Sequence, residues 1–132
     1  MSAQYPDDRL YHPEAPWLQL LAAGEALVGI NDFAQTNLGE VMFIDLPRIG
    51  EALSTGTSFG TIESSKVVSD LIAPASGSVL LINQQACDEP ALVNRDPYGE
   101  GWLLRIRLSA PDEIQSLLDA ARYLDHIGRD AA

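Results

Sequence analysis

Positive charge is scarce in this sequence. Lys66 is the only lysine among 132 residues, and the remaining fixed positive charge comes from arginines. Nineteen acidic residues bring the formal net charge to −11. Nucleic acids and anionic membrane surfaces bind basic patches, so this balance argues against both as partners. It favours partners that present basic faces, with binding that weakens as salt is added.

Sulfur ligands and long apolar runs are also missing. Cys87 is the only cysteine, so no internal disulfide can form, and no Cys/His cluster offers a metal site. No apolar run approaches the ~20 residues of a membrane span, and the polar segment from Met1 to Arg9 lacks the apolar core of a signal peptide. We therefore expect a cytoplasmic, metal-free chain, with a monomer as the default.

Apolar residues make up 46% of the chain, enough for one folded domain over residues 1–132. Residues 1–16 are proline-rich and predicted to be irregular, and residues 84–101 read as a long loop. Short apolar runs bounded by turn residues predict strands. These strands are expected at 17–21, 26–30, 41–46, 58–64, 67–72, 78–82 and 102–108. In the strand over 41–46, Val41 and Phe43 are expected to share one face.

Two helices are predicted from capping residues. Asn31 or Asp32 caps a short helix that ends at Gly39. A C-terminal helix is expected over 111–128, with Ser109 as its N-cap and acidic residues in its first turn. The pattern allows a break near Asp119, after which the helix resumes through Ile127. The fold class is therefore α+β and mainly β, an antiparallel core with its helices segregated to one end.

Lys66 lies midway between the strand-like runs 58–64 and 67–72, where the tip of a hairpin over 58–72 would fall. A lysine amine can be acylated, whereas arginine stays charged and is a poor nucleophile. Acylation would remove the charge and leave a long arm, whose end could visit several enzyme sites at high effective concentration. The plain alternative is an ordinary solvated lysine in a turn, but the absence of any other lysine favours a functional one.

Six sequence blocks occur in an order and spacing that resemble one family. They are VGINDFAQ at 28–35, LGEV at 38–41, ESSKVVSD at 63–70, APASG at 73–77, LVN at 92–94 and DPYGEGWL at 96–103. From about Trp17 to Tyr123 the chain resembles the H protein of the glycine cleavage system, a lipoyl carrier. The resemblance implies a lipoyl-domain barrel-sandwich hybrid with lipoic acid amide-linked to Lys66. It also implies that Glu63 and Asp70 help present the hairpin to a lipoate ligase or a lipoyl/octanoyl transferase.

One departure from the family pattern bears on the cargo. Where the family has a glutamate before its tryptophan, this chain has Pro16 before Trp17. In glycine-cleaving members that glutamate and the aspartate after the lysine line a cleft for the aminomethyl-loaded arm, because a sheltered ammonium needs carboxylates. Asp70 is retained here, but proline offers no carboxylate. Glu14 could substitute only if the loop is re-routed.

The resemblance also extends to H-like lipoate-binding proteins that serve sulfur oxidation with heterodisulfide-reductase-like enzymes. A sulfur adduct on the arm tends to be anionic, and a second carboxylate would repel it. We therefore slightly favour a sulfur-oxidation carrier. The alternative is an orthodox glycine cleavage carrier, served by glycine decarboxylase, aminomethyltransferase and dihydrolipoyl dehydrogenase.

Two other classes of function are weaker. A free-standing enzyme is disfavoured because no acid–base or nucleophile set is recognisable. A bare interaction module, in which Lys66 is never modified, is the remaining possibility.

Overall fold

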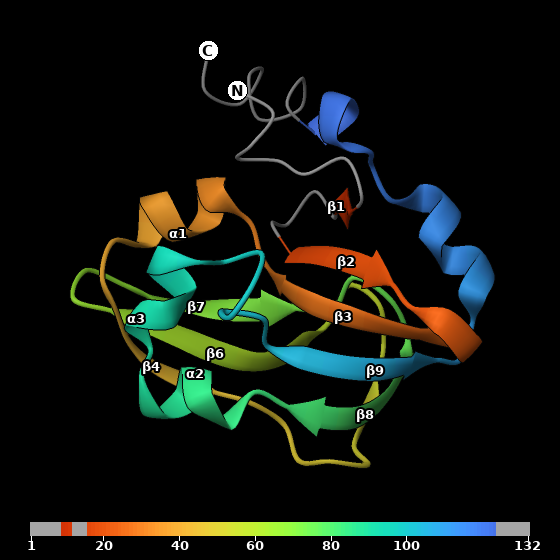
Figure 1. Cartoon of the computed structure of the whole chain (residues 1–132), viewed down its shortest axis with the longest axis horizontal. Helices are drawn as coiled ribbons and strands as arrows, with labels where there is room; N and C mark the ends of the chain where they lie inside the picture. The colour runs from red at the N-terminus through yellow and green to blue at the C-terminus, as the bar shows by residue number, and fades with distance from the viewer. Residues whose placement is uncertain (1–8, 12–15, 124–132) are drawn as a thin grey trace.

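The computed structural model describes residues 9–11 and 16–123, and its strands form two antiparallel sheets (Figure 1). The larger sheet has the strand order β1-β2-β3-β9-β8-β5 and the smaller has β4-β6-β7. The strands of the larger sheet are β1 (Leu10–Tyr11), β2 (Pro16–Leu20), β3 (Glu25–Ile30), β9 (Leu104–Leu108), β8 (Gly77–Ile82) and β5 (Ala52–Leu53). Those of the smaller sheet are β4 (Val41–Asp45), β6 (Ser58–Ser64) and β7 (Val68–Ile72).

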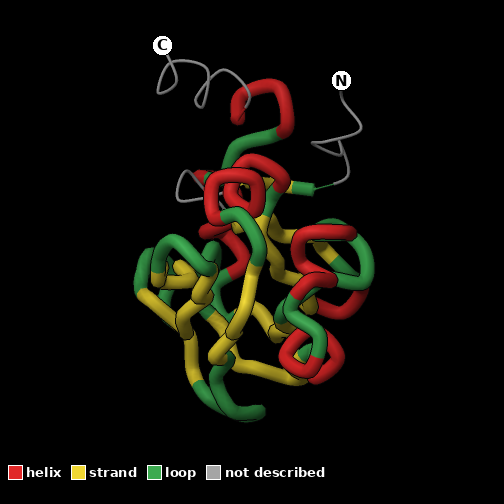
Figure 2. The backbone as a smooth tube through the Cα atoms, turned by 90° about the vertical axis from the view of Figure 1, so that its left-hand side faces the viewer, coloured by secondary structure: helices red, strands yellow, loops and turns green. Residues whose placement is uncertain are grey.

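Short helices gather at one end of the strands. They are α1 (Asp32–Leu38), α2 (Gln84–Asp88) and α3 (Ala91–Arg95). Figure 1 places all three at the end opposite the turn between β2 and β3, and Figure 2 faces that end. The mainly β fold of antiparallel strands with short helices, predicted from the sequence, is confirmed, but the helical residues that follow β9 lie toward the β2–β3 turn instead (Figure 1).

Side chains from both sheets meet in one apolar core. Val28 and Ile106 come from the larger sheet, and Ile62 and Leu71 from the smaller; each is at most 3% exposed. Burying such side chains supplies the main driving force for folding, at about 1.5–3 kcal/mol each. The core therefore fixes the position of the β6–β7 hairpin, whose inner face contributes to it.

A second buried cluster joins β1 and β2 to the C-terminal part of the described chain. The Tyr11 and Tyr123 rings stack with centroids 5.3 Å apart. The buried Trp17 donates from Nε1 to the Pro97 carbonyl at 3.0 Å. Gly29 leaves room for this indole, since a Cβ there would lie 2.6 Å from the Trp17 ring. Trp17 is thus a packing residue.

Most elements lie where the sequence placed them. The β2–β3 hairpin and the β6–β7 hairpin are both present. Asn31 is the N-cap of α1, because its Oδ1 accepts from the Ala34 N–H at 2.8 Å, and Gly39 follows the helix as predicted.

The prediction that residues 84–101 form a loop is wrong. This segment contains α2 and α3, each five residues long. Helices this short show barely more than one turn of periodicity, and Pro90 at the N-cap of α3 resembled a loop signal. The strands β1 and β5 were not predicted either, because two residues are too few to show an alternating pattern.

The predicted C-terminal helix over 111–128 is also wrong in its described part. Pro111–Ser116 forms a 3-10 helix, and its N-cap is Ala110 rather than Ser109. Leu118 then makes an isolated bridge with Tyr11, with backbone hydrogen bonds of 2.7 and 2.8 Å in the two directions. The chain is helical again from residue 120, so the interruption lies at the break that the sequence allowed near Asp119. Residues 124–128 lie outside the described part of the chain.

The faces of β4 were predicted incorrectly. Val41 is buried, yet Phe43 is 67% exposed. The pairing of β4 with β6 shifts between these two residues, and such a bulge turns following side chains to the other face.

Candidate functional site

The structure places Lys66 in the two-residue loop of the β6–β7 hairpin, as the sequence predicted. The Ser64 N–H donates to the Val67 carbonyl at 2.9 Å, leaving Ser65 and Lys66 as the loop. The Lys66 side chain is exposed. The only lysine of the chain is therefore presented at a tip where another protein can reach its amine.

Ser64 holds this loop in place with its hydroxyl. The Oγ atom accepts from the Lys66 N–H at 3.1 Å and from the Val67 N–H at 3.2 Å, and the Ser64 residue is only 6% exposed. A serine that bonds backbone groups two and three residues ahead forms a side-chain turn. The backbone of the tip is thereby fixed while the Lys66 side chain projects from it.

Gly39, which follows α1, lies beside the stem of Lys66. A Cβ built on Gly39 would lie 3.2 Å from Lys66 Cε and 3.7 Å from its Nζ. The Gly39 backbone has φ +79° and ψ −153°, a conformation that residues with a Cβ rarely adopt. A glycine here lets the lysine stem lie close to the backbone.

Asn94 of α3 fixes the segment that contains Gly39. Its Nδ2 donates to the Gly39 carbonyl at 2.8 Å and to Gln35 Oε1 at 3.0 Å, and its Oδ1 accepts from the Val41 N–H at 2.9 Å. One side chain thus joins the end of α1 to the start of β4. The sequence blocks included Asn94 and Gly39, but sequence reasoning gave Gly39 only the end of a helix and gave Asn94 no role. Only the fold brings them together beside Lys66.

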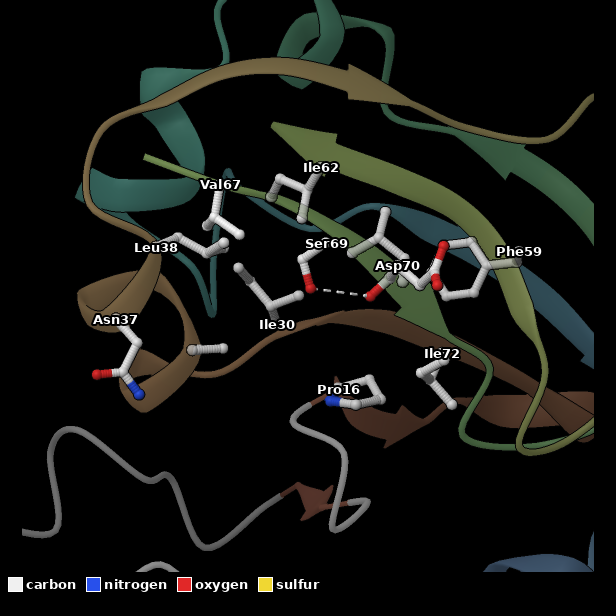
Figure 3. A pocket seen from close by; sticks show the side chains of 12 residues that line it. Pro16, Ile30, Asn37, Leu38, Phe59, Ile62, Val67, Ser69, Asp70 and Ile72 are labelled. Carbon is white, nitrogen blue, oxygen red and sulfur yellow. Dashed lines mark hydrogen bonds between the residues drawn. The ribbon is translucent and has the colours of Figure 1, made fainter. Parts of the chain in front are cut away.

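A cavity of about 270 Å³ lies next to the hairpin (Figure 3). Its walls come from β2, β3, α1, β6 and β7. The lining residues are Pro16, Ile30, Ala34, Asn37, Leu38, Phe59, Ile62, Val67, Ser69, Asp70, Leu71 and Ile72. Asp70 is the only ionisable residue in this described lining. A mostly apolar cavity with one carboxylate can shelter an alkyl chain and bind one cationic group.

The structure brings Pro16 and Asp70 to the same cavity and leaves Glu63 out of its lining. Asp70 is exposed, and its Oδ1 accepts from Ser58 Oγ at 3.3 Å. Glu63 is exposed on the outer side of the small sheet, where it pairs with Val68. The two acidic residues singled out from the sequence therefore have different surroundings. Glu14, the possible substitute for the missing glutamate, lies outside the described residues.

Comparison with known proteins identifies the family. The profile described as "Glycine cleavage H-protein" matches residues 9–129. The glycine cleavage system H protein of Opitutus terrae is 45% identical over 118 residues, which cover 89% of this chain and 93% of that protein. That of Chlorobium limicola is 46% identical over 93% of this chain and 97% of its own. The crystal structure of a glycine cleavage system H protein from Mycobacterium marinum matches with a TM-score of 0.86 and 41% identity, covering 93% of this chain and 98% of that one.

The chain belongs to the glycine cleavage H-protein family. Proteins of this family carry lipoic acid on a lysine. The residues present fit this cofactor: the chain has one lysine, its side chain is exposed on a short loop, and a mostly apolar cavity lies beside the hairpin that carries it. The fold predicted from the resemblance is confirmed by the Mycobacterium marinum structure.

Other kinds of site find little support in the described residues. They contain no cluster of three or more His, Cys, Asp or Glu side chains that could hold a metal ion. None of the helices described is both long enough and apolar enough to cross a membrane. Cys87 is a free, half-buried thiol, and burial, followed by the Asp88 and Asp45 carboxylates, raises its pKa.

Proposed function

We propose that this protein is the lipoyl-bearing carrier of a glycine cleavage system, with the lipoyl group attached to Lys66. The observation that carries this proposal is the single lysine of the chain, exposed on a two-residue hairpin loop in a fold of the H-protein family. The protein acts as a carrier subunit and does not itself catalyse a reaction.

The proposed cargo is the aminomethyl group, and the proposed partners are glycine decarboxylase, aminomethyltransferase and dihydrolipoyl dehydrogenase. Attached to Lys66, lipoate would supply a disulfide that is reduced as it takes up the aminomethyl group, and a dithiol that is reoxidised after the group has been passed on. Asp70 supports this cargo because its carboxylate lines the cavity beside the hairpin, where it can accept from a primary ammonium. The apolar residues around it exclude water from the sheltered group.

The sequence slightly favoured sulfur cargo because Pro16 replaces the family glutamate. No comparison supports that version, because the relatives described above are named glycine cleavage system H proteins. Pro16 does line the cavity with Asp70. We therefore propose that Pro16 weakens retention of the aminomethyl group and does not change the cargo.

Carbon exchange between glycine and bicarbonate tests the proposal. The fully lipoylated chain, verified by intact mass, is incubated with glycine decarboxylase, and Lys66→Arg serves as the blank. We expect robust exchange with the wild-type chain and none with the variant. Lack of exchange by verified lipoylated protein would refute the aminomethyl assignment while leaving lipoylation of Lys66 intact. Failure of any lipoylation in a competent host would refute the carrier proposal itself.

A further inference from the structure

An exposed apolar pair crosses the outer face of the small sheet. Phe43 of β4 pairs with Glu63 of β6, and Glu63 pairs in turn with Val68 of β7. Residues directly opposite each other in antiparallel strands project to the same face. Phe43 is 67% exposed and Val68 is 61% exposed. Two large apolar side chains therefore flank a solvent-facing carboxylate. We call Phe43, Glu63 and Val68 the outer row.

The outer row lies directly beside the hairpin tip. Glu63 and Val68 are the last paired residues before the turn at 64–67 that contains Lys66. Single exposed apolar residues are common and need no explanation. Here two of them stand in register with a charge between them, next to the residue that has to be modified.

The same face is acidic. Two residues further along β4 and β6, Asp45 pairs with Thr61, so its register places it on the side of the outer row. None of the residues of β4, β6 or β7 is basic. A complementary partner surface therefore has an apolar pocket rimmed by lysine or arginine side chains.

The length of the unmodified Lys66 side chain indicates which partner has to cover this surface. An enzyme that acylates Lys66 has to bring its catalytic site to an amine on a four-carbon stem, so its surface must cover the hairpin beside the tip. Enzymes that act later meet the far end of the longer lipoyl-lysine arm, so reach does not require them to cover the outer row.

We propose that Phe43 and Val68, on either side of Glu63, are the apolar anchor on which the enzyme that acylates Lys66 docks. This rests on the proposed function, because it requires that Lys66 is acylated. In that step the neutral Lys66 amine attacks the carbonyl carbon of a lipoyl-adenylate made from lipoate and ATP. An amide bond forms, AMP leaves, and the proton of the amine is released. The resemblance assigns recognition to Glu63 and Asp70, whereas the apolar contact made by Phe43 and Val68 is new.

Acylation kinetics with a purified lipoate–protein ligase, lipoate and ATP test the proposal. The unmodified chain is varied in concentration and product is counted by intact mass, with Lys66→Arg as the blank. The test variant is Phe43→Ser with Val68→Thr. The matched control is Leu20→Ser, because Leu20 is 48% exposed and lies at the far end of the molecule, near the β2–β3 turn (Figure 1).

We expect the KM of the double variant to rise about tenfold or more, the size of effect seen when interface anchors are truncated. The kcat measured at saturating concentrations of the double variant should change little, and the control variant should have the KM and kcat of the wild-type chain. Raising salt should raise the KM of the wild-type chain, since the acidic face attracts a basic partner. An unchanged KM for the double variant, with normal acylation of wild type, would overturn the docking proposal alone. No acylation of wild type would instead count against the proposed function.

A second measurement does not depend on the folding of the variants. The Lys66→Arg chain is titrated with ligase while NMR signals of aromatic and methyl groups are followed. We expect the Phe43 and Val68 signals to shift or broaden and those of Leu20 to stay. Unchanged Phe43 and Val68 signals, with shifts at Leu20 instead, would overturn the proposal.

Discussion

Pro16 and Asp70 line the same cavity, Pro16 from the first position of β2 and Asp70 from the edge strand β7 (Figure 3). Pro16 is buried and pairs with Ile30, so its ring occupies a fixed place in the wall. The cavity thus has one carboxylate where the family pattern predicts two.

The first prediction concerns this missing carboxylate. Pro16→Glu should slow the loss of the aminomethyl group from the loaded protein by about 3–10-fold. A second charge-assisted hydrogen bond to an ammonium contributes about 1.5–3 kcal/mol, and partial exposure reduces that gain. The measurement is the release of ammonia and formaldehyde from loaded protein over time. Pro16→Gln is the matched control, because it has the same shape without the charge. Equal rates for the Glu and Gln variants would rule out the electrostatic explanation.

The second prediction concerns the hairpin tip. Ser64→Ala should lower the free energy of unfolding by about 1 kcal/mol, since the Lys66 and Val67 N–H groups lose their common acceptor. The melting temperature should fall by about 3–5 °C, and hydrogen exchange of both amides should accelerate. Ser65→Ala is the control: Ser65 is exposed in the same loop, so its effect should stay within about 0.5 kcal/mol. If both variants melt alike, the hydroxyl of Ser64 does not hold the loop.

Sequence reasoning predicted the elements that carry their own local signals. The N-cap at Asn31, the glycine after α1, and the hairpin around Lys66 all follow from residues close together in the chain. It failed where a distant strand decides the outcome. The sequence allows a break in the C-terminal helix near Asp119, but the bridge between Tyr11 and Leu118 joins distant residues, and no local pattern at residues 111–128 announces this pairing.

The residues of the candidate site divide in the same way: some carry a signal in the sequence, and others depend on contacts between distant segments. Lys66 could be found by counting lysines, and Asp70 and Pro16 by comparison with the family pattern. The exposure of Phe43 could not be predicted, because strict alternation from the buried Val41 put it on the wrong face and the bulge is visible only in the pairing with β6. The contacts of Asn94 with Gly39 and Val41 cross more than fifty residues and depend on α3, which was predicted as loop.

The third prediction is a pH dependence at Cys87. Burial, and then the Asp88 and Asp45 carboxylates, raise the pKa of this thiol above its ordinary value. Thiolate is the reactive form, so at any pH near 8 the folded chain should react with iodoacetamide more slowly than the chain unfolded in urea. When the labelling rate is plotted against pH, the rise for the folded chain should therefore lie at higher pH than the rise for the unfolded chain. Because the folded state holds this proton more tightly, its contribution to stability is present below the ordinary thiol pKa and is lost as the pH rises past the raised one.

Labelling is followed by intact mass across a series of pH values. Asp88→Asn is a useful comparison, because removing one nearby carboxylate should move the folded profile toward lower pH without abolishing the shift, since burial is the larger cause. Folded and unfolded chains that react at the same rate across the series would contradict the prediction.

The fourth prediction concerns Gly39 and the stem of Lys66. Gly39→Ala should lower the free energy of unfolding by about 1–3 kcal/mol, because φ +79° with ψ −153° strains a residue that has a Cβ. The new methyl would also lie 3.2 Å from Lys66 Cε, so the lysine stem should move. Gly24→Ala is the matched control: Gly24 has φ +75°, and a Cβ there meets nothing within 4 Å. Urea unfolding measures the stability of both variants, and NMR of the lysine methylenes measures the displacement. Changed Lys66 signals in Gly39→Ala alone would establish that the two residues are in contact, and unchanged signals in both variants would contradict it.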